Sequence, residues 1–282
     1  MANLNKTKRR IRSVNYTKKI TSAMELVSTI KLKRYKNVML SYQNYIEEIS
    51  SFVFNVLKGI NDQNSIEKYI VDKNASKDLV IVISSNLGLC ASFNNDIVKF
   101  VSNNINKDDV ELLLIGNKAN KPLEQLGYSL NKDYINLNEN INYSDLRNLS
   151  NKLLDEFLKE KYKSIKVVYT KFVNSIRFNP SVITLLPFDI NKVSLTSNQY
   201  PPIYDSDPKT LIEEIMPLYI SSTLYQKVVE SEVSQQASRR NAMEAATDNA
   251  DELIDKLTIE YNKARQASIT QEITEVISST LK

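Results

Sequence analysis

Two long stretches without helix-breaking residues, one at each end of the chain, limit the possible folds more than any other feature. Residues 3–58 contain neither glycine nor proline, and residues 208–281 contain no glycine and, besides Pro208, only Pro217. We expect both arms to be uninterrupted helices, with a kink at Pro217 because proline removes a backbone hydrogen bond. Such helices would extend roughly 80 Å and 105 Å, too long for one compact domain to enclose.

Apolar residues in both arms repeat at the alternating spacing of three and four that is typical of a coiled-coil seam. The first arm is basic and the second is richer in acids than in bases, so we predict that the two arms form an antiparallel coiled coil. Its seam comprises Tyr35, Val38, Tyr42, Tyr45, Ile49, Phe52 and Val56, extended upstream by Ile20, Met24, Val27 and Ile30, facing Ala250, Ile254, Leu257, Tyr261, Ala264, Ser268 and Gln271. The second arm is longer, so its tip should project as a single helix with short polar side chains.

The middle of the chain has the alternating pattern of an α/β domain. Residues 78–84 and 109–116 are apolar runs typical of strands buried on both faces. Helices are predicted over 93–103, over 118–126 ending at Gly127, and over 145–159 with Ser144 as N-cap. Strands near 164–173 and 176–186 are too close for a crossover and should pair antiparallel. The predicted fold is therefore α/β plus long α: a Rossmann-like mixed-sheet domain over 70–205, inserted into a coiled-coil shaft formed by 1–60 and 208–282.

The residue types exclude several kinds of active site. The chain has no histidine, which removes a histidine base, a Ser/His/Asp relay and a histidine-ligated metal, and its one cysteine, Cys90, cannot form an intramolecular disulfide. The loop SNLGLCASFNND after the first strand lacks both glycine-rich phosphate motifs. We therefore expect no catalytic residues, no bound cofactor and no metal, and we expect Cys90 to be a packed side chain.

The first third of the N-terminal arm is strongly basic, and Glu25 is its one acid. The bases are Lys6, Lys8, Arg9, Arg10, Arg12, Lys18, Lys19, Lys31, Lys33, Arg34 and Lys36. Three readings follow from this pattern: a solvated face, an arm that binds nucleic acid, or a surface for a partner lined with carboxylates. No apolar run approaches the roughly 18–20 residues that a membrane span needs, so a soluble intracellular protein is expected.

Three stretches resemble the gamma subunit family of F-type ATP synthases. IRSVNYTKKITSAMELVSTIKLKR (11–34) is similar to the N-terminal motif of that family, and AATDNADELIDKLTIEYNKARQASITQEITEVISS (245–279) is similar to its C-terminal signature. GLC (88–90) fits the central loop. In one place the chain departs from the pattern, because Ala91 and Ser92 stand where the family usually has Gly-Gly.

The resemblance implies a rotor shaft inside a ring of alternating alpha and beta subunits, whose α/β domain meets the epsilon subunit and the membrane c-ring. Catalytic sites in this family belong to beta, so the chain would be a non-catalytic subunit, peripheral to the cytoplasmic face of the cell membrane, with no nucleic-acid partner. The family's contacts with alpha and beta carry over to Met24, Arg239, Arg240, Arg265, Gln266, Thr270 and Glu272.

Two other functions compete with this reading. A duplicated F-type-like ATPase motor, used for other mechanical work such as gliding motility, would have a rotor with nearly the same sequence. A coiled-coil nucleic-acid binder would use the basic first arm and would bind DNA with a steep dependence on salt.

Overall fold

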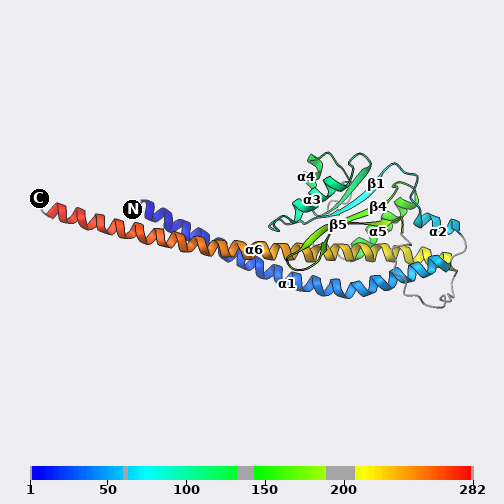
Figure 1. Ribbon diagram of the computed structural model, residues 1–282, viewed down its shortest axis with the longest axis horizontal. Helices are drawn as coiled ribbons and strands as arrows, with labels where there is room; N and C mark the ends of the chain where they lie inside the picture. The colour runs from blue at the N-terminus through cyan, green and yellow to red at the C-terminus, as the bar shows by residue number, and fades with distance from the viewer. Residues whose placement is uncertain (1, 60–62, 132–142, 189–206, 281–282) are drawn as a thin grey trace. The chain divides into compact units, whose positions relative to one another are not determined.

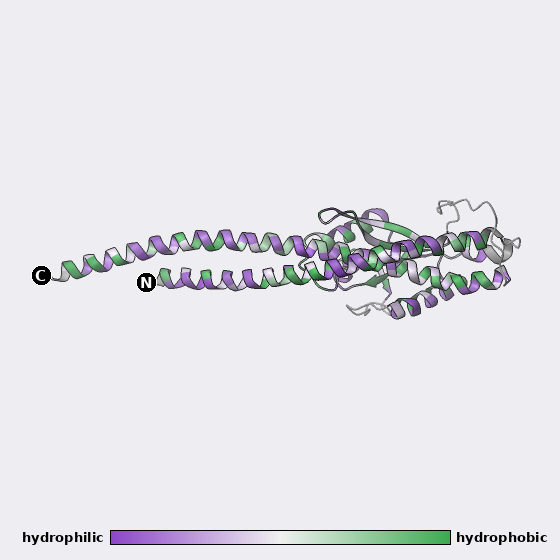
Figure 2. Ribbon diagram, turned by 90° about the horizontal axis from the view of Figure 1, so that it is seen from below, coloured by the Kyte–Doolittle hydropathy of each residue, from purple (hydrophilic) through white to green (hydrophobic). Residues whose placement is uncertain are grey.

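The computed structural model describes residues 2–59, 63–131, 143–188 and 207–280 (Figure 1). The two predicted arms are confirmed as single helices, α1 (Ala2–Gly59) and α6 (Pro208–Thr280). α6 continues through Pro217, so this proline does not end the helix, and the kink expected there stays a prediction. Hydrophobic and hydrophilic residues alternate at short intervals along both helices, as expected for amphipathic helices (Figure 2).

The middle of the chain forms a five-stranded mixed sheet with the strand order β3-β2-β1-β4-β5. β1 pairs in parallel with β2 and β4, β2 pairs in parallel with β3, and β4 pairs antiparallel with β5. The elements are α2 (Gln63–Ile70), β1 (Asp78–Ile83), α3 (Phe93–Asn104), β2 (Val110–Ile115), α4 (Asn120–Gln125), β3 (Ser129–Asn131), α5 (Tyr143–Leu158), β4 (Ile165–Phe172) and β5 (Phe178–Leu186). The predicted Rossmann-like mixed sheet is confirmed, including the antiparallel strand at its edge. The short elements α2 and β3 were not predicted.

The described chain divides into two compact units, and each is treated by itself. The end unit comprises Met1–Ile30 with Arg239–Lys282, and the sheet unit comprises Lys31–Ser238. This division by compactness does not test the predicted segments 1–60 plus 208–282 and 70–205, which stay a prediction. The inner halves of α1 and α6 group with the sheet because their apolar residues belong to its core.

Buried side chains cover both faces of the sheet. On one face, α3 and α4 pack against β1 and β2 through residues such as Ile97, Leu123 and Leu112. On the other face, α5 and the inner parts of α1 and α6 form a larger cluster that includes Val53 and Ile220 (Figure 1). Burial on both faces explains why the strands read as continuous apolar runs.

In the sheet unit, two of the seven predicted seam residues of α1 are exposed, and the other five are buried or half-buried. The predicted residues Tyr45 and Phe52 are 42% and 37% exposed, whereas Val53 is fully buried. The inward-facing residues are Leu32, Tyr35, Met39, Tyr42, Ile46, Ile49, Val53 and Val56, again at spacings of three and four. Both registers are apolar in sequence, and only packing against the other helices selects between them.

Two predictions about helix ends have different outcomes. Gly127 follows the last turn of α4 with a φ of +86°, and its N–H donates to the carbonyl oxygen of Glu124 at 3.0 Å, so its predicted role is confirmed. Ser144 is not an N-cap, because α5 already begins at Tyr143. The hydroxyl of Tyr143 lies 3.1 Å from that of Ser221 on α6, a tertiary contact that the local sequence does not reveal.

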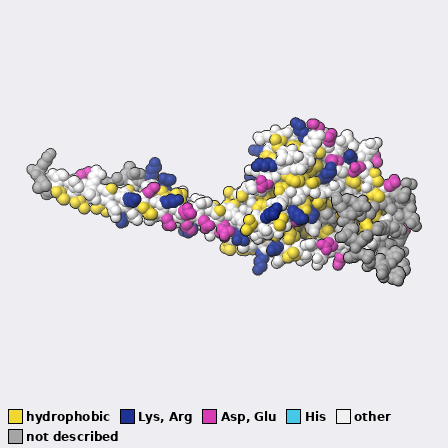
Figure 3. Space-filling view, viewed as in Figure 1, with side chains coloured by type: hydrophobic (Ala, Val, Ile, Leu, Met, Phe, Trp, Pro, Cys, Tyr) yellow, Lys and Arg dark blue, Asp and Glu magenta, His cyan; other side chains and the backbone are white. Residues whose placement is uncertain are grey.

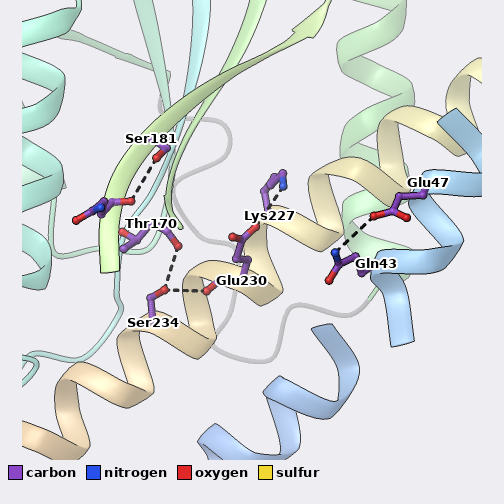
Figure 4. Close-up of polar contacts among 8 residues, drawn as sticks. Gln43, Glu47, Thr170, Ser181, Lys227, Glu230 and Ser234 are labelled. Atoms are coloured by element: carbon purple, nitrogen blue, oxygen red, sulfur yellow. Dashed lines mark hydrogen bonds and ion pairs between the residues drawn. The ribbon is translucent and has the colours of Figure 1, made fainter. Parts of the chain in front are cut away.

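The hydroxyl of Ser234 on α6 binds the helix to β4 near the carboxyl end of that strand. The Ser234 hydroxyl lies 3.1 Å from the carbonyl oxygens of both Thr170 on β4 and Glu230 (Figure 4). One turn away, the Lys227 ammonium pairs with the Glu230 carboxylate at 3.2 Å and lies 4.8 Å from the centre of the Tyr169 ring. Burial, and then the Glu230 charge, raise the pKa of Tyr169 to about 12.

Candidate functional site: the paired helix ends

The ends of the two helices pair antiparallel in the end unit. The Thr21 and Thr247 hydroxyl oxygens lie 2.8 Å apart, and the Lys18 ammonium pairs with the Asp251 carboxylate at 2.5 Å. Lys18 precedes Thr21 on α1, whereas Asp251 follows Thr247 on α6, so the two helices run in opposite directions. The electrostatic complementarity expected between the arms is present in this pair, although an exposed ion pair stabilises a protein by only about 0–1 kcal/mol.

On α6 the predicted seam is confirmed as far as Ser268. Its residues are buried or half-buried: Ala250, Ile254, Leu257, Tyr261, Ala264 and Ser268. Gln271, which was predicted to continue this seam, is exposed. Within the described residues, the buried side of α6 therefore ends at Ser268.

The seam of α1 in the end unit is largely not the predicted one. Ile20, Val27 and Ile30 are 60%, 51% and 61% exposed, while Thr21 and Ser28 are buried at 8% and 1%. Met24 is half-buried, the one member of the upstream set that is not exposed. Small hydroxyl side chains occupy the interface because they let the two helices approach closely and can hydrogen-bond across it.

Turning the small residues inward leaves an apolar stripe on the outer face of α1. Tyr16, Ile20, Ala23, Val27 and Ile30 follow each other at spacings of four and three and are all exposed. Contiguous exposed apolar surface marks contact sites for other proteins. Three of its members, Ile20, Val27 and Ile30, belong to the seam predicted from the sequence.

The tip of α6 after Ser268 is exposed throughout its described length. It is not as poor in apolar residues as the sequence analysis expected: Ile269, Ile273, Val276 and Ile277 are 47%, 54%, 64% and 53% exposed. Hydrophobic side chains line one edge of this segment, which lies at the C-terminal end in Figure 3. The tip is therefore an amphipathic helix without a partner helix in the described chain.

Four of the predicted contact residues lie on or beside this tip, and all four are exposed: Arg265, Gln266, Thr270 and Glu272. The Thr270 hydroxyl donates to the carbonyl oxygen of Gln266 at 2.9 Å, and the Glu272 carboxylate accepts from the Ser268 hydroxyl at 3.3 Å. Both contacts are local to one helix, so these groups keep acceptor capacity for another molecule.

The two predicted arginines have different environments. Arg239 is only 6% exposed. Arg240 is half-buried, and its guanidinium pairs with the Glu244 carboxylate one turn away at 3.4 Å. Of the two, Arg240 is the one that presents its charge at the surface.

The loop after β1 is held by its own polar contacts. Cys90 is buried, as expected; its Sγ accepts from the Asn94 amide at 3.2 Å, and its carbonyl oxygen accepts from the Ser238 hydroxyl at 2.7 Å. Ligands of open α/β sheets lie at the carboxyl ends of the strands, and here α6 contacts the loop at that end. Leu89 and Ala91 have φ values of +62° and +46°, a region that favours glycine.

None of the described helices contains an apolar stretch suited to spanning a lipid bilayer.

Comparison with known proteins identifies the family. The ATP synthase family model matches residues 3–280. The chain is 40% identical to the ATP synthase gamma chain of Mycoplasma mobile over 99% of this chain and 98% of that protein. It is 34% identical to the gamma chain of Mycoplasma capricolum over the same shares.

The chain belongs to the ATP synthase gamma chain family.

Solved structures agree on the fold of this gamma-chain family member. The rotor of the Euglena gracilis mitochondrial ATP synthase matches with a TM-score of 0.65 and 16% identity, covering 95% of this chain and 99% of that chain. The central stalk and c-ring structure from Tetrahymena thermophila matches with a TM-score of 0.60 and 24% identity, covering 80% and 99%. Two long helices joined to a mixed sheet are thus shared at low sequence identity.

Proposed function

We propose that the chain is the central rotor subunit of an F-type ATP synthase, which couples rotation to conformational change in the catalytic beta subunits and performs no catalysis itself. One observation carries the proposal: in a member of the gamma-chain family, the described tip of α6 after Ser268 is exposed on all sides. A helix with exposed isoleucines at its end gains stability when another protein surrounds it.

The two kinds of side chain on the tip suit two tasks. Apolar contact is non-directional, so Ile269, Ile273 and Ile277 can hold the tip inside a smooth collar without favouring one angle. Hydrogen bonds and ion pairs are directional. The bonds that Gln266 and Glu272 form with a partner can therefore be made and broken as the shaft turns. The tip is thereby retained and still free to rotate.

Coupling follows from differential contact. α6 is one continuous helix that begins in the sheet unit and ends in the end unit, so torque applied to it in one unit is passed to the other. Each conformation of a beta subunit would be favoured by the face of the shaft that it meets. By linkage, the nucleotide state of beta biases the angle of the shaft in return.

The contact residues proposed for alpha and beta are Met24, Arg239, Arg240, Arg265, Gln266, Thr270 and Glu272. The burial of Arg239 favours a supporting role for it and a direct contact for Arg240. The exposed stripe of Tyr16, Ile20 and Val27 adds a second surface for the same partners. The epsilon subunit and the membrane c-ring are proposed partners of the α/β domain, which places the chain at the cytoplasmic face of the cell membrane as a peripheral subunit without a nucleic-acid partner.

A rotor for a duplicated ATPase motor remains the alternative function. The relatives reported above carry the synthase name, and we therefore propose the synthase.

The test is reconstitution of the chain with purified alpha and beta subunits. We expect a stable complex that hydrolyses ATP and rotates a bead attached to the sheet unit. Assembly and hydrolysis that proceed equally well without the chain would contradict the proposal.

A further inference from the structure

The hairpin between β4 and β5 presents an apolar tip to solvent. Ile176 is 85% exposed, more than any other large apolar side chain in the described ranges, and Val173 is 50% exposed. A single exposed apolar residue is ordinary. Two of them on one turn, at the end of a hairpin that the sheet holds in place, form a small anchor of the kind that fills a pocket on a partner.

The tip is pre-organised by its own hydrogen bonds. The side-chain oxygen of Asn174 accepts from the backbone N–H groups of Ile176 at 2.9 Å and Arg177 at 2.7 Å. The N–H groups of Val173 and Asn174 both donate to the carbonyl oxygen of Arg177. Ordering of the turn is thus complete before any partner binds, which reduces the entropic cost of association.

The base of the hairpin is packed against both long helices within the sheet unit. Phe172 and Phe178, which face each other across the two strands, pack on a cluster that contains Leu32 of α1 and Val233 of α6. The ammonium of Lys36 on α1 lies 5.9 Å from the centre of the Phe172 ring. A load on the tip therefore reaches α1 and α6 through direct contact.

The charges around the tip point to the chemistry of a partner. Lys171 and Arg177 flank the apolar residues, both are exposed, and neither forms an ion pair with another described residue. Lys36 adds a third positive charge beside Phe172. Such a surface is complementary to carboxylates and would repel a second copy of itself.

We propose that the β4–β5 tip docks into an apolar pocket with an acidic rim on another subunit of the ATP synthase complex. The proposal rests on the proposed function for the identity of the complex. In it, Ile176 and Val173 fill the pocket, while Lys171 and Arg177 pair with carboxylates at its rim. The contact gives the sheet unit its own attachment, separate from that of the α6 tip.

The test places a photo-crosslinking amino acid at position 176 in the chain assembled with the remaining subunits, with Leu126 as matched control. Leu126 is also an apolar residue at the surface, 46% exposed, next to α4. We expect cross-links from 176, but not from 126, to a segment rich in Asp, Glu and apolar residues on another subunit. Replacing Lys171 and Arg177 by serine should lower the yield about threefold or more at low salt and by much less at high salt.

The outcomes separate the two proposals. If the chain assembles with alpha and beta but position 176 gives no cross-link, only the docking proposal fails. Cross-links to another copy of this chain, or to a surface without carboxylates, also overturn it. If the chain does not assemble with alpha and beta, the proposed function fails first, and the identity of the partner fails with it.

Discussion

Replacing Ala91 by glycine should stabilise the sheet unit through backbone conformation alone. Ala91 has a φ of +46°, and its side chain is exposed, so removing the methyl group sacrifices no packing. The left-handed conformation costs an L-residue roughly 1–2 kcal/mol. The greater freedom of glycine in the unfolded chain offsets about 0.5–1 kcal/mol of that gain. The expected net increase in the free energy of unfolding is about 0.5–1 kcal/mol.

Two glycines of the same unit provide matched controls. Gly127 has a φ of +86°, and a Cβ built there meets nothing within 4 Å, so Gly127→Ala isolates the backbone cost and should destabilise by about 1 kcal/mol. Gly116 has a φ of +98°, and a Cβ there would lie 2.1 Å from the carbonyl oxygen of Ser84. Gly116→Ala should therefore be the most destabilising of the three.

The assay is urea unfolding of the full chain followed by circular dichroism, with hydrogen exchange of the β1 and β2 amides to report the sheet unit separately. The order of midpoints should be Ala91→Gly, wild type, Gly127→Ala and Gly116→Ala, from highest to lowest. A lower midpoint for Ala91→Gly, with an unchanged slope, would show that the left-handed backbone is not what limits this loop.

Three further outcomes are expected. Val53→Ala should lower the free energy of unfolding in the urea assay by about 2 kcal/mol because it opens a cavity. Phe52→Ala should lower it by less than about 1 kcal/mol. Equal losses would support the seam predicted from the sequence, in which Phe52 faces inward. Burial raises the pKa of Tyr162 to about 12, so between pH 10 and about 12 the native protein keeps the phenol proton that the unfolded chain loses. The free energy of unfolding should therefore fall over this range in an alkaline thermal-denaturation series. The Tyr162→Phe variant should show a smaller fall. Gln266→Ala combined with Thr270→Ala should lower the torque of the reconstituted complex while shifting the melting temperature of the isolated chain by less than about 2 °C; a large drop in melting temperature would argue for a structural role.

The order of elements was readable from sequence because each has a strong local signal. Residues 78–84 and 109–116 are uninterrupted apolar runs and became β1 and β2 within one residue of their predicted ends. Gly127 marks the end of α4 because its positive φ is a conformation that glycine adopts easily. β3 has only three residues and no pattern of its own, so its pairing with β2 could not be foreseen.

At the tip of α6, the sequence alone did not reveal which side chains are exposed. Arg265, Gln266, Thr270 and Glu272 were named through family resemblance, and the structure adds that they are exposed. Ile273 and Val276 stand in the same segment, for which the sequence analysis expects short polar side chains. Only their exposure on an unpaired helix marks them as surface that another protein could cover.

The sequence by itself determined that both ends of this chain are long helices around an α/β segment, because the absence of glycine and proline and the heptad spacing act locally. It also determined the family, through two long motifs in the correct order. Only the tertiary structure decided which side of α1 faces inward. In the end unit its sequence offers an apolar register and a register with small hydroxyl residues. The choice of Thr21 and Ser28 over Ile20 and Val27 depends on how closely α6 can approach, a distance set by both helices together.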